Sequence, residues 1–81
     1  MNQFSVQLFA RYADVLGHPE VAVTVPAEAC VRDVIAALRR LPGGTMLPAE
    51  PFVAVNMRQV PPDTRLHPGD EIALLPPLAG G

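Results

Sequence analysis

The stretch that decides the fold is residues 31–41, VRDVIAALRRL. Its apolar side chains recur every three or four residues, which is the spacing of an amphipathic helix; they are Val31, Val34, Ile35, Leu38 and Leu41. The charged side chains are predicted to face away from this stripe; they are Arg32, Asp33, Arg39 and Arg40. Cys30 takes the N-cap position, where serine or threonine is more usual, and residues 42–44, Pro-Gly-Gly, end the helix. We predict one main helix whose apolar stripe needs a second layer to pack against.

Strand patterns before the helix begin to supply that layer. Apolar and polar residues alternate over residues 3–9 and again over residues 21–25, which is typical of strands with one buried face. Between them, residues 10–16 predict a short helix that ends at Gly17, since glycine suits the position just after a helix.

The remaining strands are predicted after the helix. Residues 52–55, FVAV, are apolar on both faces and predict a central strand. Residues 56–59 are the expected turn into a short return strand near Val60. A turn, His67-Pro68-Gly69-Asp70, leads into a last strand over residues 71–75. The fold class is therefore α+β, a mixed sheet of four to five strands with one main helix packed on one face.

Size and composition exclude several classes of function. The chain has 81 residues, which is room for one domain, and a net charge of -2, which argues against nucleic-acid binding by phosphate neutralisation. No apolar run is long enough to cross a membrane and no signal peptide is visible, so we expect a cytoplasmic protein. A single cysteine, Cys30, excludes an internal disulfide or a four-thiolate cluster. His18 and His67 lack the spacing of metal ligands, and we expect no bound metal or cofactor.

The face of the sheet away from the helix breaks its polar pattern at two positions. On the first strand this face carries polar residues until Phe9, and on the last strand it begins with Glu71 and ends with Leu75. If the two strands are neighbours, Phe9 and Leu75 form one exposed apolar patch. If they are not, loops or the short helix cover them. Departures of this kind often mark functional positions.

The chain ends in Pro76-Pro77-Leu78-Ala79-Gly80-Gly81. Two prolines disfavour helix and sheet ladder and favour an extended backbone, and six extended residues reach roughly 20 Å. Gly80 and Gly81 carry no side chain, so the terminal carboxylate can enter a channel too narrow for other residues. The alternative is a terminus that frays without a role.

These residues resemble a known family. Residues 69–81, GDEIALLPPLAGG, are similar to the carboxyl-terminal signature of the MoaD family, the small subunit of molybdopterin synthase. Residues 8–11 resemble the family's first strand, residues 31–35 its main helix and residues 54–56 its central strand. The tail differs from the usual pattern at Leu78 and Ala79.

The resemblance implies a ubiquitin-like β-grasp fold with the first and last strands adjacent and parallel at the sheet centre. Residues 1–75 would be the β-grasp domain and residues 76–81 an extended tail. An ATP-dependent, E1-like enzyme would adenylate Gly81, and a sulfur donor of the cysteine desulfurase or rhodanese type would convert it to a thiocarboxylate. The carrier would then donate sulfur inside the large subunit of molybdopterin synthase, and catalytic groups would lie on its partners. The expected docking residues are Phe9, Leu75, Pro76, Pro77, Leu78 and Ala79.

Other functions remain open at this point. A related carrier would serve another acceptor, in tRNA thiolation, thiazole synthesis or cysteine synthesis. A ubiquitin-like modifier would join the same activated Gly81 to lysines of other proteins; the chain itself has no lysine, since all six basic residues are arginine. A pure interaction module would never activate its tail.

Overall fold

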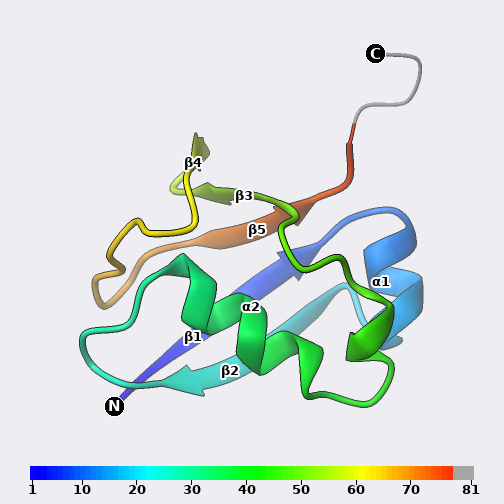
Figure 1. The fold of residues 1–81 in the computed structure, drawn as a ribbon, viewed down its shortest axis with the longest axis horizontal. Coiled ribbons are helices and arrows are strands. Elements are labelled where there is room, and N and C mark those ends of the chain that lie inside the picture. The colour runs from blue at the N-terminus through cyan, green and yellow to red at the C-terminus, as the bar shows by residue number, and fades with distance from the viewer. Residues whose placement is uncertain (78–81) are drawn as a thin grey trace.

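The computed structural model describes residues 1–77. Five strands form one mixed sheet in the order β2-β1-β5-β3-β4, and Figure 1 shows a helix crossing one face of it. The elements, in chain order, are β1 Asn2–Leu8, α1 Arg11–Leu16, β2 Glu20–Val25, α2 Val31–Arg39, the 3-10 turn η1 Gly44–Met46, β3 Phe52–Val55, β4 Arg58–Val60 and β5 Ile72–Leu75. The predicted α+β architecture is confirmed.

The sheet is held together at its centre by the two strands nearest the chain ends. β1 and β5 pair in parallel, with Val6 opposite Ile72 and Leu8 opposite Leu74. β2 pairs with the other side of β1 and β3 with the other side of β5, both antiparallel. This parallel central pair is the arrangement that the family resemblance implies. Residues 52–55 form the interior strand that the sequence predicts, because β3 pairs with β5 on one side and β4 on the other and three of its four residues are buried.

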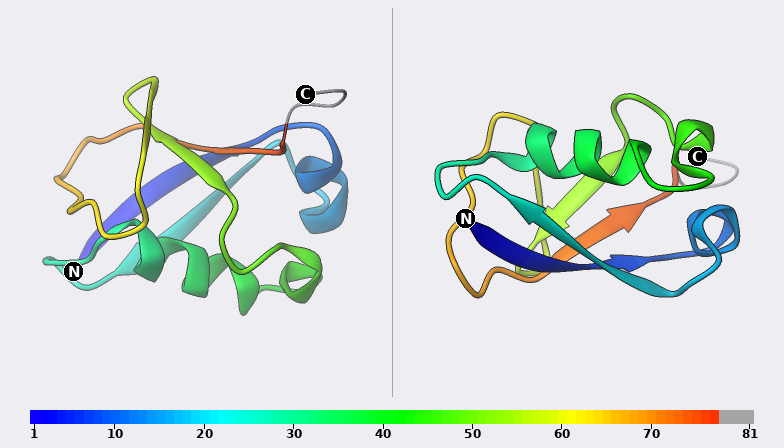
Figure 2. Two further views of the ribbon diagram at one scale, coloured as in Figure 1. Left: turned by 45° about the horizontal axis from the view of Figure 1, so that its top comes forward. Right: turned by 90° about the horizontal axis from the view of Figure 1, so that it is seen from below.

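The main helix packs as its apolar stripe predicts. Val31, Val34, Ile35 and Leu38 are all buried, and Figure 2 shows α2 lying across one face of the sheet. The seven most completely buried large side chains come from the helix and from three strands; they are Leu38, Ile72, Leu74, Val6, Val31, Val34 and Val53. The core is therefore the layer between α2 and the sheet.

Two details at the end of α2 differ from the prediction. The helix ends at Arg39, so Leu41 packs against the core from the loop that follows. Arg39 was expected to face away, but it is half-buried, and its Nε lies buried with no hydrogen-bond partner among residues 1–77. Pro42 has no N–H to continue the helix, and at Gly44 a Cβ would collide with the Leu38 carbonyl oxygen. The chain folds back so tightly over the last turn that a side chain does not fit.

Cys30 and Asp33 form a capping box at the start of α2. The Cys30 backbone N–H donates to Asp33 Oδ2 at 2.9 Å, which satisfies one of the donors that a helix start leaves free. The Cys30 thiol also lies 3.5 Å from the same oxygen. Asp33 in the first turn additionally places a negative charge at the positive end of the helix dipole.

No helix in residues 1–77 has the length and apolar character that crossing a membrane requires.

Candidate functional site

The end of β5 brings together side chains from three strand segments on the face that α2 leaves open. Leu75 lies opposite Phe52 of β3 in the antiparallel register. On the other side, Leu8 is paired with Leu74, so Phe9, the next residue, reaches the level of Leu75. We call Phe9, Phe52 and Leu75 the apolar patch. The condition of the prediction, that the first and last strands are neighbours, is confirmed by this pairing.

The apolar patch is accessible to solvent. Phe9 is 45% exposed and Phe52 48% exposed, while Leu75 and the following Pro76 are half-buried. Large aromatic rings left this open are candidates for a protein interface, since aromatic residues dominate the binding energy of such surfaces. The apolar patch is therefore a candidate docking surface at the point where the chain leaves the sheet.

Phe52 was missed by the sequence analysis. It stands at the head of the run FVAV, which reads as apolar on both faces, and alternation gave no reason to separate it from the buried Val53. Only its pairing with Leu75 reveals that it belongs to the open face. In the sequence, only the position of Phe52 at the start of the strand, directly after Pro51, sets it apart from the buried residues that follow.

An unusual backbone holds Phe9 in place. The Phe9 carbonyl accepts a hydrogen bond from the Tyr12 N–H at 3.0 Å, and Tyr12 is buried in the core. Between them, Ala10 takes a φ of 51°, a conformation that non-glycine residues seldom adopt. Strain of this kind persists only where the surroundings impose it, so the junction between β1 and α1 fixes where Phe9 points.

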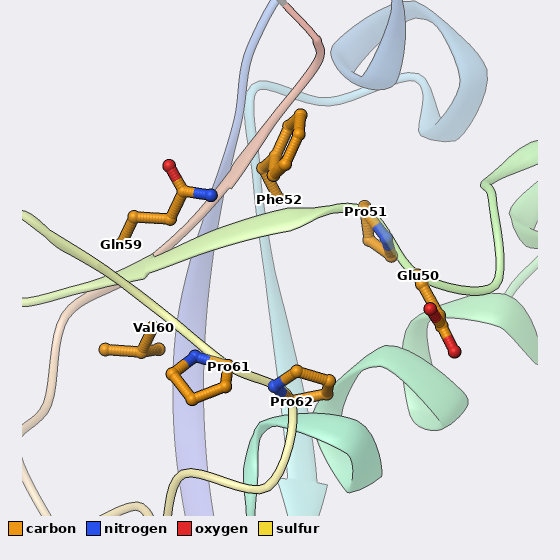
Figure 3. A pocket seen from close by; sticks show the side chains of 7 residues that line it. All are labelled: Glu50, Pro51, Phe52, Gln59, Val60, Pro61 and Pro62. Atoms are coloured by element: carbon orange, nitrogen blue, oxygen red, sulfur yellow. The ribbon is translucent and has the colours of Figure 1, made fainter.

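A groove of about 410 Å³ continues the apolar patch toward the β4 side of the sheet. Figure 3 shows the residues that line it, which are Glu50, Pro51, Phe52, Gln59, Val60, Pro61 and Pro62. Phe52 belongs to both features, and in Figure 3 the Gln59 amide extends toward its ring. The groove therefore adjoins the apolar patch through Phe52.

The opposite end of β5 is anchored by a hydrogen-bonded turn. Asn56 and Glu71 exchange two bonds, from the Asn56 N–H to the Glu71 carbonyl at 2.8 Å and from the Glu71 N–H to Asn56 Oδ1 at 2.9 Å. Asp70 accepts from Asn56 Nδ2 at 3.0 Å and from the His67 N–H at 2.8 Å. The turn role predicted for Asp70 is confirmed, and the network fixes the register in which β5 enters the sheet.

No group of three or more histidine, cysteine, aspartate or glutamate side chains within residues 1–77 is placed to hold a metal ion. Cys30 takes the N-cap position of α2, and its thiol lies 3.5 Å from Asp33 Oδ2.

The sequence-predicted site residues fall into two groups. Phe9, Leu75, Pro76 and Pro77 are described. Phe9 directly follows β1, Leu75 is the last residue of β5, and Pro76 and Pro77 come after it. Leu78, Ala79, Gly80 and Gly81 lie outside the described residues.

Comparison with known proteins gives this surface a context. A profile of the ThiS family matches residues 6–81. The molybdopterin synthase sulfur carrier subunit of Dictyostelium discoideum is 30% identical over 84 residues, covering 99% of this chain and 98% of that protein.

Two solved structures are similar over nearly their whole length. Small archaeal modifier protein 1 of H. volcanii superposes with a TM-score of 0.85 at 28% identity, covering 96% of this chain and 100% of that one. A putative molybdopterin converting factor subunit 1 from Pyrococcus furiosus gives a TM-score of 0.83 at 28% identity, again with 96% and 100% coverage. The parallel central strands, the single covering helix and these relatives show that the chain belongs to the ThiS family, as a MoaD-like sulfur carrier with the ubiquitin-like β-grasp fold.

Proposed function

We propose that the chain is the small subunit of molybdopterin synthase and that the Gly81 carboxylate carries the sulfur used to make molybdopterin. The observation that carries this proposal is the course of β5, which leaves the sheet centre beside the apolar patch and continues through Pro76 and Pro77 toward Gly81. A partner that docks on the patch is thereby positioned to receive the tail. The similar protein from Dictyostelium discoideum is a molybdopterin synthase sulfur carrier subunit, which supports this assignment.

The chemistry requires activation of the tail. A free α-carboxylate is ionised at neutral pH and resists nucleophiles. In the proposed sequence, a Gly81 carboxylate oxygen attacks the α-phosphorus of ATP on an E1-like enzyme, pyrophosphate leaves, and an acyl adenylate forms. A persulfide from a desulfurase or rhodanese-type donor displaces AMP, and a thiol then reduces the resulting acyl disulfide to the thiocarboxylate. ATP is a substrate of the activating enzyme and is not held by this chain.

The division of labour follows from where the groups lie. Residues 1–75 act as the folded body that partners recognise, and residues 76–81 act as the arm that carries the reactive carbon. The large subunit of molybdopterin synthase docks on the apolar patch and supplies the catalytic groups. Gly80 and Gly81 let the arm enter a narrow channel, because neither has a side chain to clash with its walls.

Intact mass tests the proposal directly. The protein is incubated with ATP, the cognate activating enzyme and a persulfide donor, and we expect a gain equal to the exchange of one oxygen for one sulfur, located at Gly81. A variant with one residue appended after Gly81 is the matched control and should show no gain. Absence of the gain in the original chain, with an enzyme shown to charge another carrier, would overturn the assignment.

A second candidate function is favoured by one comparison. The H. volcanii protein of similar structure is a small archaeal modifier protein. The same activated Gly81 would then form an amide bond with a lysine of another protein. Adducts of higher mass that are linked through Gly81 to other proteins in cells would support this role. Their absence leaves the carrier role alone.

A further inference from the structure

The two edges of the sheet are protected very differently. β4 is three residues long, begins with Arg58 and is followed by Pro61 and Pro62, which are features that prevent edge-to-edge pairing. β2 is six residues long, EVAVTV, with no proline and no charge after Glu20. Exposed edges of this composition are templates for another strand.

The outward hydrogen-bonding groups of β2 follow from its pairing with β1. The Leu8 N–H donates to the Pro19 carbonyl at 2.8 Å, so Leu8 and Pro19 are a hydrogen-bonded pair. The next pair, Gln7–Glu20, and every second pair after it, Ser5–Ala22 and Gln3–Thr24, are then pairs without hydrogen bonds between them. Antiparallel pairs alternate, so the backbone N–H and C=O groups of Glu20, Ala22 and Thr24 point away from β1. Within residues 1–77 no other segment donates to or accepts from them. Figure 2 (right) looks onto this side of the molecule, where β2 passes in front of β1.

We propose that this edge pairs with β2 of a second copy of the chain, antiparallel and centred on Ala22. In that register Ala22 faces Ala22 of the second copy, and Glu20 faces Thr24 in both directions. Every outward donor and acceptor of the three residues then finds a partner. A shift toward Pro26 leaves the Glu20 carbonyl without a donor, because proline has no N–H.

Side chains agree with this register. The pairing brings alanine against alanine at its centre and sets no charge opposite a like charge. The outer face at Ala22 and Thr24 is exposed, so both side chains are free to meet their counterparts. A groove of about 450 Å³, lined by Leu16, His18, Glu20, Val21, Ala22, Leu41 and Pro42, leaves open space beside the start of β2.

The proposed pairing is independent of the sulfur-carrier function. β2 is separated from β5 by β1 in the sheet order. The apolar patch at the end of β5 therefore lies away from the proposed dimer edge. One strand pair buries little surface, so the expected dissociation constant is roughly 0.1–1 mM, typical of a weak association.

Matched charge variants at Thr24 test the register. Thr24 faces the neutral Gln3 within its own chain, so a charge there changes little in the monomer. Thr24→Lys sets an ammonium opposite Glu20 of the second copy twice and should tighten the dimer about tenfold, whereas Thr24→Glu should weaken it about tenfold. Sedimentation equilibrium over a concentration series measures both constants, and circular dichroism confirms that both variants fold.

A backbone variant checks that the edge itself pairs. Thr24→Pro removes only an outward N–H and leaves the bonds between β1 and β2 in place, so a folded Thr24→Pro protein should be monomeric. A monomer at about 1 mM for the original chain, or a dimer whose constant is the same in Thr24→Lys and Thr24→Glu, would overturn the proposal. Gly81 charging is unaffected in either case, which separates this failure from a failure of the proposed function.

Discussion

Consecutive side chains of β5 enter two different environments. Ile72 and Leu74 face the core that α2 covers and are 1% and 0% exposed, whereas Ala73 and Leu75 lie on the open face and are half-buried. Leu74 and Leu75 are the same residue type on the same strand, one serving stability and the other available for recognition. The comparison teaches that apolar character alone does not assign a role, because the pleat of the strand decides which face receives it.

The largest effect is expected from truncating the two leucines separately. Leu74→Ala should lower the free energy of unfolding by about 2–5 kcal/mol, since it leaves a cavity in a closed core. Leu75→Ala should cost less than about 1 kcal/mol, because water already reaches this side chain. Urea unfolding of both variants measures the difference, and equal losses would show that the two faces are not distinct.

Charged substitutions on the open face should weaken binding to a partner. Phe52→Asp and Leu75→Asp should each weaken association with the large subunit of molybdopterin synthase by more than about 1 kcal/mol, because they put a charge into a desolvated contact. Phe9→Asp should behave in the same way. Titration calorimetry gives the affinities, and thermal unfolding checks the fold.

A control for these variants lies on the same face. Gln3→Asp adds the same charge on an exposed position of β1, at the end remote from Phe9, and should leave the affinity unchanged. If the three apolar-patch variants bind as tightly as the control while folded, the apolar patch is not the docking surface.

A smaller effect is expected at Ala10, in the junction between β1 and α1. Ala10→Gly should stabilise the fold by about 1 kcal/mol, since glycine accepts the positive φ without steric cost. The same change gives Phe9 more conformational freedom. Binding must then order Phe9, so the affinity for the large subunit should fall. Melting temperature and calorimetry separate the two consequences, and a destabilised Ala10→Gly variant would contradict the assignment of strain.

The smallest effect belongs to a charge pair that lies on neither face. Glu28 and Arg65 form an ion pair at 2.8 Å, with their side chains 82% and 59% exposed. Glu28→Gln should change the free energy of unfolding by less than about 0.5 kcal/mol, because solvent screens exposed pairs. A loss well above this value in a urea titration would show that the contact organises the neighbouring loop.

Much of the fold could be predicted from local pattern. The stripe from Val31 to Leu38 was sufficient for α2, and Gly17, with a φ of 79°, ends α1 as expected. Local pattern could not order the strands, because alternation states which face is buried and not which strand lies beside it. The parallel pair of β1 and β5 came from the family resemblance.

The candidate site was only partly accessible to the same reasoning. Phe9 and Leu75 stood out because they break a polar pattern, whereas Phe52 did not, since its strand has no polar pattern to break. Arg39 was misplaced for a related reason: a charge on a helix predicts exposure, but the chain turns back at Gly44 and covers it. The Phe52 error concerns a long-range strand pairing, whereas the Arg39 error concerns a local turn whose path the helical pattern does not predict.

The parallel pairing of β1 and β5 also has a mechanical consequence. The amino end of β1 and the carboxyl end of β5 point to opposite sides of the molecule (Figure 1). A pull applied between the two ends of the chain therefore loads the bonds joining Val6, Gln7 and Leu8 to β5 in shear, so that they must yield together instead of opening one after another. The rate of unfolding under force depends on the unfolding barrier. We expect the parallel pair to give a high barrier when force is applied to the carboxyl-terminal tail.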